Sequence, residues 1–134
     1  MCTYPYMKRM TNKMAKVLLV EDDELVRYSL TELLEEAGHQ VLARENGYKI
    51  IEFIESHPVD IVLTDIVMSE VDGMEVLTAM RKSFPDLPVV ALSGGGRISG
   101  ADYLQMAEVI GAKRTIPKPV KPDVLLDAVA ELCA

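Results

Sequence analysis

Residues 59–77 read VDIVLTDIVMSEVDGMEVL and join a short apolar run to a helical pattern. The run Asp60–Thr64 (DIVLT) is continuous rather than alternating, which is typical of a strand buried on both faces. After it, Asp72-Gly73-Met74-Glu75 resembles a capping box. Apolar residues then recur at helical spacing, namely Met74, Leu77, Met80 and Phe84. The stretch therefore predicts a buried strand, a loop and a helix.

This strand-then-helix pattern occurs five times along the chain. The predicted strands are Val17–Val20, Gln40–Ala43, Asp60–Thr64, Pro88–Leu92 and Lys113–Ile116. The predicted helices are Val26–Ala37, Ile50–Ile54, Met74–Phe84, Tyr103–Ile110 and Val124–Leu132. Because most of the strands are apolar throughout, we expect a parallel sheet with helices on both faces. The sequence thus predicts a single α/β domain with (βα)₅ organisation and right-handed crossovers.

The composition limits the classes of protein to which this chain can belong. The chain has 134 residues, of which 49% are hydrophobic, enough for one domain with a real core. The formal net charge of −7 argues against binding to nucleic acids or anionic membranes. The longest uncharged run, Leu87–Gly96, has ten residues and is too short to span a bilayer. Cys2 and Cys133 lie at opposite ends and form neither a disulfide framework nor a metal-binding spacing. We therefore expect a cytoplasmic protein.

The two ends of the chain differ in pattern. Residues 1–15 have no clear periodicity, so we predict a flexible leader there and a domain over 16–134. A secretory signal is not expected. Only one predicted helix follows Lys118, which indicates a stand-alone domain without an output domain. A domain excised from a longer protein is equally compatible with the sequence.

The ends of the predicted strands carry the residues suited to chemistry. Glu21 and Asp22 follow the first strand, Asp65 the third and Ser93 the fourth, and Lys118 lies at the end of the fifth. Ligands of open parallel sheets bind beyond these carboxyl ends. Carboxylates 4 Å apart repel by about 4 kcal/mol at an effective dielectric of about 20, so we expect a hard divalent cation such as Mg²⁺. A metal-held phosphate beside a free aspartate suggests phosphoryl transfer onto the carboxylate.

Four motifs of the sequence resemble the receiver domain of two-component response regulators. They are VLLVEDDE (17–24), VDIVLTDIVMSEVDGMEVL (59–77), VVALSGGG (89–96) and PKPV (117–120), in the same order and spacing as in that family. The resemblance covers about residues 16–134. It implies a flavodoxin-like fold with strand order 2-1-3-4-5 and a signalling switch rather than an enzyme.

The resemblance also implies roles for individual acidic residues. Asp65 is similar to the phosphoacceptor, which receives phosphate from a histidine of a partner kinase or phosphotransfer protein. Asp22 is similar to the direct metal ligand, and Glu21 to an acidic neighbour that acts through water. The backbone carbonyl of Val67 is expected as a further ligand of Mg²⁺, with Mn²⁺ as an alternative ion.

On the remaining strands, Ser93 occupies the position of the switch hydroxyl, and Lys118 is similar to the lysine that contacts the phosphate. The family usually has a cis bond at the position of Lys118–Pro119. Three features depart from the family pattern. Thr115 replaces a common aromatic residue, and Ser69 replaces the usual proline in the loop after the phosphoacceptor. Three glycines follow Ser93, and we expect them to make that loop mobile. The absence of the aromatic residue argues against the usual ring-rotation readout.

Two other functions remain as alternatives. An aspartate-nucleophile phosphatase needs a second aspartate two positions after the nucleophile, where this chain has Val67. A degenerate receiver that acts only as an interaction module would lack a residue such as Asp65 or Lys118, and both are present. The sequence leaves the output partner and phosphorylation-dependent dimerisation open. His39 and His57 fall in loops away from the acidic residues, where we expect both to be solvated.

Overall fold

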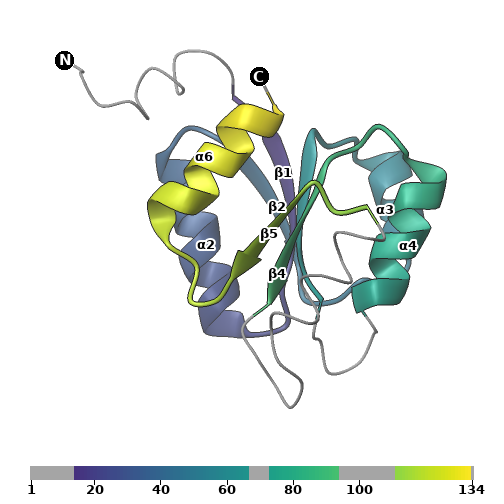
Figure 1. Cartoon of the computed structure of the whole chain (residues 1–134), viewed down its shortest axis with the longest axis horizontal. Coiled ribbons are helices and arrows are strands. Elements are labelled where there is room, and N and C mark those ends of the chain that lie inside the picture. The colour runs from purple at the N-terminus through teal and green to yellow at the C-terminus, as the bar shows by residue number, and fades with distance from the viewer. Residues whose placement is uncertain (1–13, 67–72, 94–110, 134) are drawn as a thin grey trace.

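The computed structural model describes residues 14–66, 73–93 and 111–133. A five-stranded parallel sheet forms its centre, with helices on both faces (Figure 1). The strands are β1 (Lys16–Val20), β2 (Gln40–Arg44), β3 (Ile61–Asp65), β4 (Val89–Ser93) and β5 (Arg114–Pro117). They lie in the order β2-β1-β3-β4-β5, which confirms the predicted topology.

The described helices form two layers. Helices α2 (Glu24–Glu36) and α6 (Pro122–Leu132) cover one face of the sheet, and α3 (Ile50–Ser56) and α4 (Gly73–Ser83) cover the other (Figure 1). The helix predicted over Tyr103–Ile110 lies outside the described residues. Among the helices that are described, none is both long enough and apolar enough to cross a bilayer.

The core has two halves, one on each face of the sheet. Along β1, Val17 and Leu19 pack into the half that includes residues of α2 and α6. Leu18 and Val20 pack into the other half, with residues of α3 and α4. The central strands β3 and β4 are buried along their whole length, which confirms the interpretation of their continuous apolar runs.

The observed strands differ slightly from the predicted ones at their ends. The strands β3, β4 and β5 each begin and end one residue later than their apolar runs suggested. As a result, Asp65 and Ser93 are the last residues of β3 and β4 rather than the first residues of loops. Backbone pairing in the sheet therefore holds them, with Asp65 beside Leu92 and Ser93 beside Pro117.

The ends of α2 follow from its flanking residues. The carboxylate of Asp23 accepts hydrogen bonds from the backbone N–H groups of Leu25 and Val26, which makes Asp23 the N-cap. Gly38 follows the helix with a φ of 98°, in the left-handed region that favours glycine. The helix begins two residues before the predicted Val26 and ends one residue before the predicted Ala37.

His39 was predicted to be solvated, and this prediction was wrong. The ring is half-buried, and its Nδ1 accepts a hydrogen bond of 3.1 Å from the backbone N–H of Ala15. Ala15 was assigned to the leader but is itself buried in the core. His57, in contrast, is exposed as expected and stacks on Phe53.

Candidate functional site

Three carboxylates converge at the carboxyl edge of the sheet. Glu21 and Asp22 directly follow β1, and Asp65 ends β3, the strand paired with β1. One carboxylate oxygen from each of the three lies within 4.8 Å of the others. Glu21 and Asp65 are 0% and 4% exposed, whereas Asp22 is open to solvent. The proximity expected from the strand ends is therefore present.

Lys118 brings a cation to this cluster from the segment after β5. Its Nζ lies 2.6 Å from Oε1 of Glu21 and 2.6 Å from Oδ2 of Asp65. The backbone N–H of Lys118 donates a 2.8 Å hydrogen bond to the carbonyl of Ser93, which fixes the segment to the end of β4. The bond between Lys118 and Pro119 is cis, as the resemblance implied.

Burial and charge shift the protonation equilibria in this site. Burial raises the pKa of Glu21 above its ordinary value, with a further increase from the charge of Asp65, although Lys118 and the N–H of Asp23 act in the opposite direction. Burial by itself lowers the pKa of Lys118, but its hydrogen bonds to Asp65 and Glu21 outweigh this effect and raise it. Lys118 therefore stays an ammonium at neutral pH.

The donors of the cluster fit a hard divalent cation. Three carboxylates and one ammonium leave a formal charge of −3 + 1 = −2, which one such ion would neutralise. All the side-chain donors are oxygens, the ligands that Mg²⁺ prefers. The exposed carboxylate of Asp22 leaves the cluster accessible from solvent. Val67, whose carbonyl was predicted as another ligand, lies outside the described residues.

Ser93 places a hydroxyl at the same edge of the sheet. The residue is 1% exposed, and its Oγ has no hydrogen-bond partner in the described part of the chain. A buried hydroxyl that has no partner costs free energy. Thr115, which replaces the family's aromatic residue, is half-buried in β5.

Sequence reasoning missed two arginines that support the site. Nη1 of Arg27 donates a 2.8 Å hydrogen bond to the backbone carbonyl of Glu21. The backbone carbonyl of Arg44, the last residue of β2, accepts a 2.9 Å hydrogen bond from the N–H of Glu21. These contacts depend on loop geometry and on strand pairing, and the sequence offers no local pattern that would reveal them.

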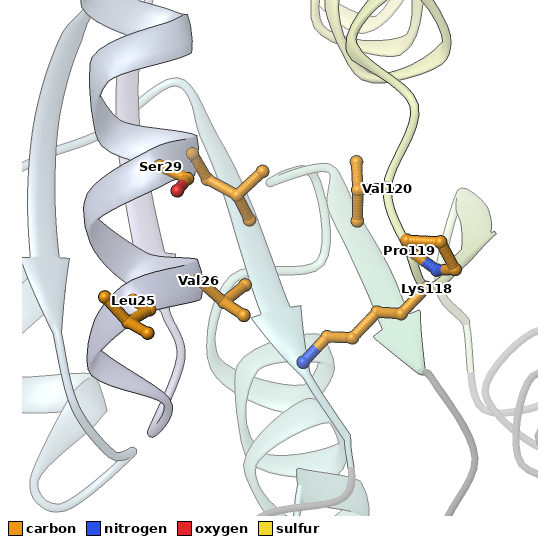
Figure 2. Close-up of a pocket in the computed structure, with 7 residues that line it drawn as sticks. Leu25, Val26, Ser29, Lys118, Pro119 and Val120 are labelled. Atoms are coloured by element: carbon orange, nitrogen blue, oxygen red, sulfur yellow. The ribbon is translucent and has the colours of Figure 1, made fainter.

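An apolar hollow of about 500 Å³ opens beside the site. Figure 2 shows its lining from two segments, helix α2 on one side and residues 118–120 on the other. The lining residues are Leu25, Val26, Ser29, Leu30, Lys118, Pro119 and Val120. Leu25 is 78% exposed, so an apolar side chain lies open to solvent here. The hollow and the carboxylate cluster share Lys118, which makes them contiguous.

Comparisons with known proteins agree with this fold. Residues 17–130 match the family model of the response regulator receiver domain. The response regulator receiver protein CpdR of Brucella abortus is 38% identical over 81 residues, which cover 60% of this chain and 68% of CpdR. The sensor kinase/phosphatase CqsS of Vibrio cholerae is 30% identical over 118 residues, which cover 86% of this chain but only 17% of CqsS.

Solved structures give the same result. A receiver domain protein from Clostridium thermocellum has a TM-score of 0.81 at 27% identity, with 90% of this chain and 94% of that chain covered. The receiver domain of NtrX from Brucella abortus has a TM-score of 0.80 at 28% identity, with 87% and 97% covered. The chain, whose strand order and acidic cluster had already indicated this fold, belongs to the family of response regulator receiver domains.

Proposed function

We propose that residues 16–134 form a receiver that accepts a phosphoryl group on Asp65 and changes conformation to signal to an output partner. The phosphodonor is a histidine of a partner kinase or phosphotransfer protein. The observation that carries the proposal is the position of the Asp65 carboxylate, 2.6 Å from the Lys118 ammonium and beside two further carboxylates. The protein is then a switch rather than an enzyme, and we propose a cytoplasmic location.

The acidic residues would hold Mg²⁺, or Mn²⁺ in its place. Asp22 and Asp65 would ligate the ion directly, Glu21 through water, and the carbonyl of Val67 would complete the protein ligands. When bound, the ion neutralises charge on the phosphoryl oxygens. The donor set and the formal charge of −2 support this assignment.

The reaction uses Asp65 as the nucleophile. An oxygen of its carboxylate attacks phosphorus, a P–O bond forms, and the P–N bond of the phosphohistidine breaks with its electron pair returning to the imidazole. Lys118, already in contact with Oδ2, is close enough to pair with an oxygen of the transferred group. The hydroxyl of Ser93 would donate to another phosphoryl oxygen, and this buried hydroxyl has no partner among the described residues.

The phosphodonor must reach Asp65 past the rim of the site, where the apolar hollow lies. Because Lys118 belongs both to the hollow and to the cluster, a protein that delivers phosphate to Asp65 would also cover the hollow. The exposed side chain of Leu25 offers apolar contact area to such a partner. We therefore assign the hollow to the protein that carries the phosphohistidine.

Intact mass after incubation with acetyl phosphate and Mg²⁺ tests the proposal. Wild-type protein should gain one phosphate, and the gain should disappear with EDTA and in Asp65→Asn. A folded, Mg²⁺-binding wild type that gains no phosphate, from acetyl phosphate or from any phosphohistidine protein, would instead support the interaction module. Steady turnover of a phosphate ester would support the phosphatase.

A further inference from the structure

We propose that Arg27 is a positioning residue that fixes the backbone around Asp22 and so sets the affinity of the site for divalent cations. The inference rests on the proposed function, because it takes Asp22 as a metal ligand. Within the described residues, no hydrogen bond joins the side chain of Arg27 to the three carboxylates. Its guanidinium contacts the main chain instead, at the carbonyl of Glu21, 2.8 Å from Nη1.

The backbone N–H, the backbone carbonyl and both carboxylate oxygens of Glu21 all have hydrogen-bond partners. Its N–H donates to the carbonyl of Arg44 at 2.9 Å, and its carbonyl accepts from Arg27. Its carboxylate accepts from Lys118 at 2.6 Å through Oε1 and from the backbone N–H of Asp23 at 3.0 Å through Oε2. Since Glu21 is completely buried, a carbonyl without a partner would be costly there.

Two of these bonds lie on either side of Asp22. The carbonyl held by Arg27 belongs to the peptide group before Asp22, and the N–H held by the Glu21 carboxylate belongs to the peptide group after it. Both peptide planes around this exposed residue are therefore fixed. A carboxylate on a fixed backbone loses less entropy when it binds an ion than one on a mobile loop.

The place of Arg27 in the helix also calls for an explanation. It is the fourth residue of α2, in the first turn, where the helix dipole disfavours a positive charge. Its backbone N–H already bonds to the carbonyl of Asp23 at 2.9 Å, so the helix does not need the side chain. The contact with Glu21 supplies a local reason for a long cation at this position.

Positioning and simple electrostatics predict opposite effects of removing Arg27. If only its charge mattered, Arg27→Met would make the negative cluster more negative and Mg²⁺ would bind more tightly. If Arg27 holds the backbone, the same substitution loosens Asp22 and Mg²⁺ binds more weakly. Changes to residues that orient metal ligands typically weaken metal binding by about tenfold or more.

The experiment compares Mg²⁺ titration calorimetry on the full chain for wild type, Arg27→Met, Arg27→Lys and Arg114→Met. Arg114 is an exposed arginine at the start of β5, paired with Glu131, so its substitution removes the same charge far from the carboxyl edge. We expect binding about tenfold weaker for Arg27→Met, an intermediate loss for Arg27→Lys, and less than a twofold change for Arg114→Met. Lysine keeps the charge but not the planar set of donors.

A second readout needs no metal. In EDTA, hydrogen exchange of the Asp23 amide should be faster in Arg27→Met than in wild type, with a smaller increase in Arg27→Lys. The reason is that the hydrogen bond from this amide to the carboxylate of Glu21 weakens when the backbone around Asp22 becomes more mobile. Mg²⁺ binding by Arg27→Met that is as tight as or tighter than wild type would overturn the assignment of Arg27 alone. A wild type that does not bind Mg²⁺ would overturn the metal site itself, and this inference with it.

Discussion

Nζ of Lys118 lies 2.6 Å from Oδ2 of Asp65, although the two residues are 53 positions apart in the chain. The same ammonium lies 2.6 Å from Glu21, so one cation joins the carboxyl ends of β1, β3 and β5. Both carboxylates are buried, and this contact compensates part of the charge of each. The contact thus links the stability of the fold to the chemistry proposed for the site.

Lys118→Met should destabilise the metal-free protein, because it removes an ammonium that contacts two buried carboxylates. Removal of one partner of a buried ion pair typically costs about 3 kcal/mol. Urea unfolding in EDTA should show a loss of this order, and Mg²⁺ should restore part of it. Lys113→Met serves as a control, because Lys113 is exposed. Equal losses for the two variants would show that the Lys118 contacts do not stabilise the fold.

Ser93→Ala should not destabilise the protein, although it abolishes the response to phosphorylation. The buried hydroxyl has no partner in the described residues, so its removal should leave the free energy of unfolding unchanged or raise it by about 1 kcal/mol. Amide chemical shifts before and after phosphorylation measure the response, and Ser93→Thr, which keeps the hydroxyl, should retain it. A full set of shift changes in Ser93→Ala would contradict the switch role.

Leu25→Asp should separate protein phosphodonors from small ones. The side chain is largely exposed, so the fold should tolerate the change, but a charge in the hollow opposes an apolar contact. Phosphotransfer from a phosphohistidine protein that labels wild type should slow by about tenfold, the effect of losing a contact worth about 1.4 kcal/mol. The rate with acetyl phosphate serves as the control and should not change. Equal slowing with both donors would place Leu25 in the chemistry rather than in docking.

His39 should make stability fall in mildly acidic solution. Burial lowers the pKa of this imidazole below its ordinary value of 6.5, so the unfolded chain binds the proton more readily than the native protein does. Its contribution to stability is then complete above pH 6.5 and is lost as the pH falls toward the lowered pKa of the folded state. Protonation also removes the lone pair that accepts from Ala15.

Urea unfolding at pH 7.5 and pH 5 measures this effect. Wild type should lose more stability over that interval than His39→Gln, which cannot be protonated. If the two proteins lose the same stability, the Ala15–His39 contact has no role in the pH dependence.

Most of the fold could be predicted because its signals are local. Continuous apolar runs mark β3 and β4 as buried, and apolar residues at helical spacing indicate α2. The order of the strands was predicted from the family resemblance, because the sequence of a strand such as 61–65 does not indicate which strands pair with it.

The site was predictable only in part, for the same reason. Residues at strand ends meet at one edge, so Glu21, Asp22, Asp65 and Lys118 could be grouped from the sequence. The contact of Arg27 with a main-chain carbonyl could not be predicted. Many types of side chain can donate to a backbone carbonyl, so such a contact leaves no recognisable pattern in the sequence. Burial of His39 was missed because it depends on how the chain enters β1.

The central claim is that Asp65 itself becomes phosphorylated, and chemical trapping of the acyl phosphate tests it most directly. Borohydride reduces an aspartyl phosphate to homoserine and leaves phosphate esters and unmodified aspartate unchanged. After treatment with acetyl phosphate and Mg²⁺, then borohydride and proteolysis, peptide sequencing by mass spectrometry should find homoserine at position 65 and nowhere else. Homoserine at another carboxylate such as Asp22, or none in a protein that has gained phosphate, would contradict the account.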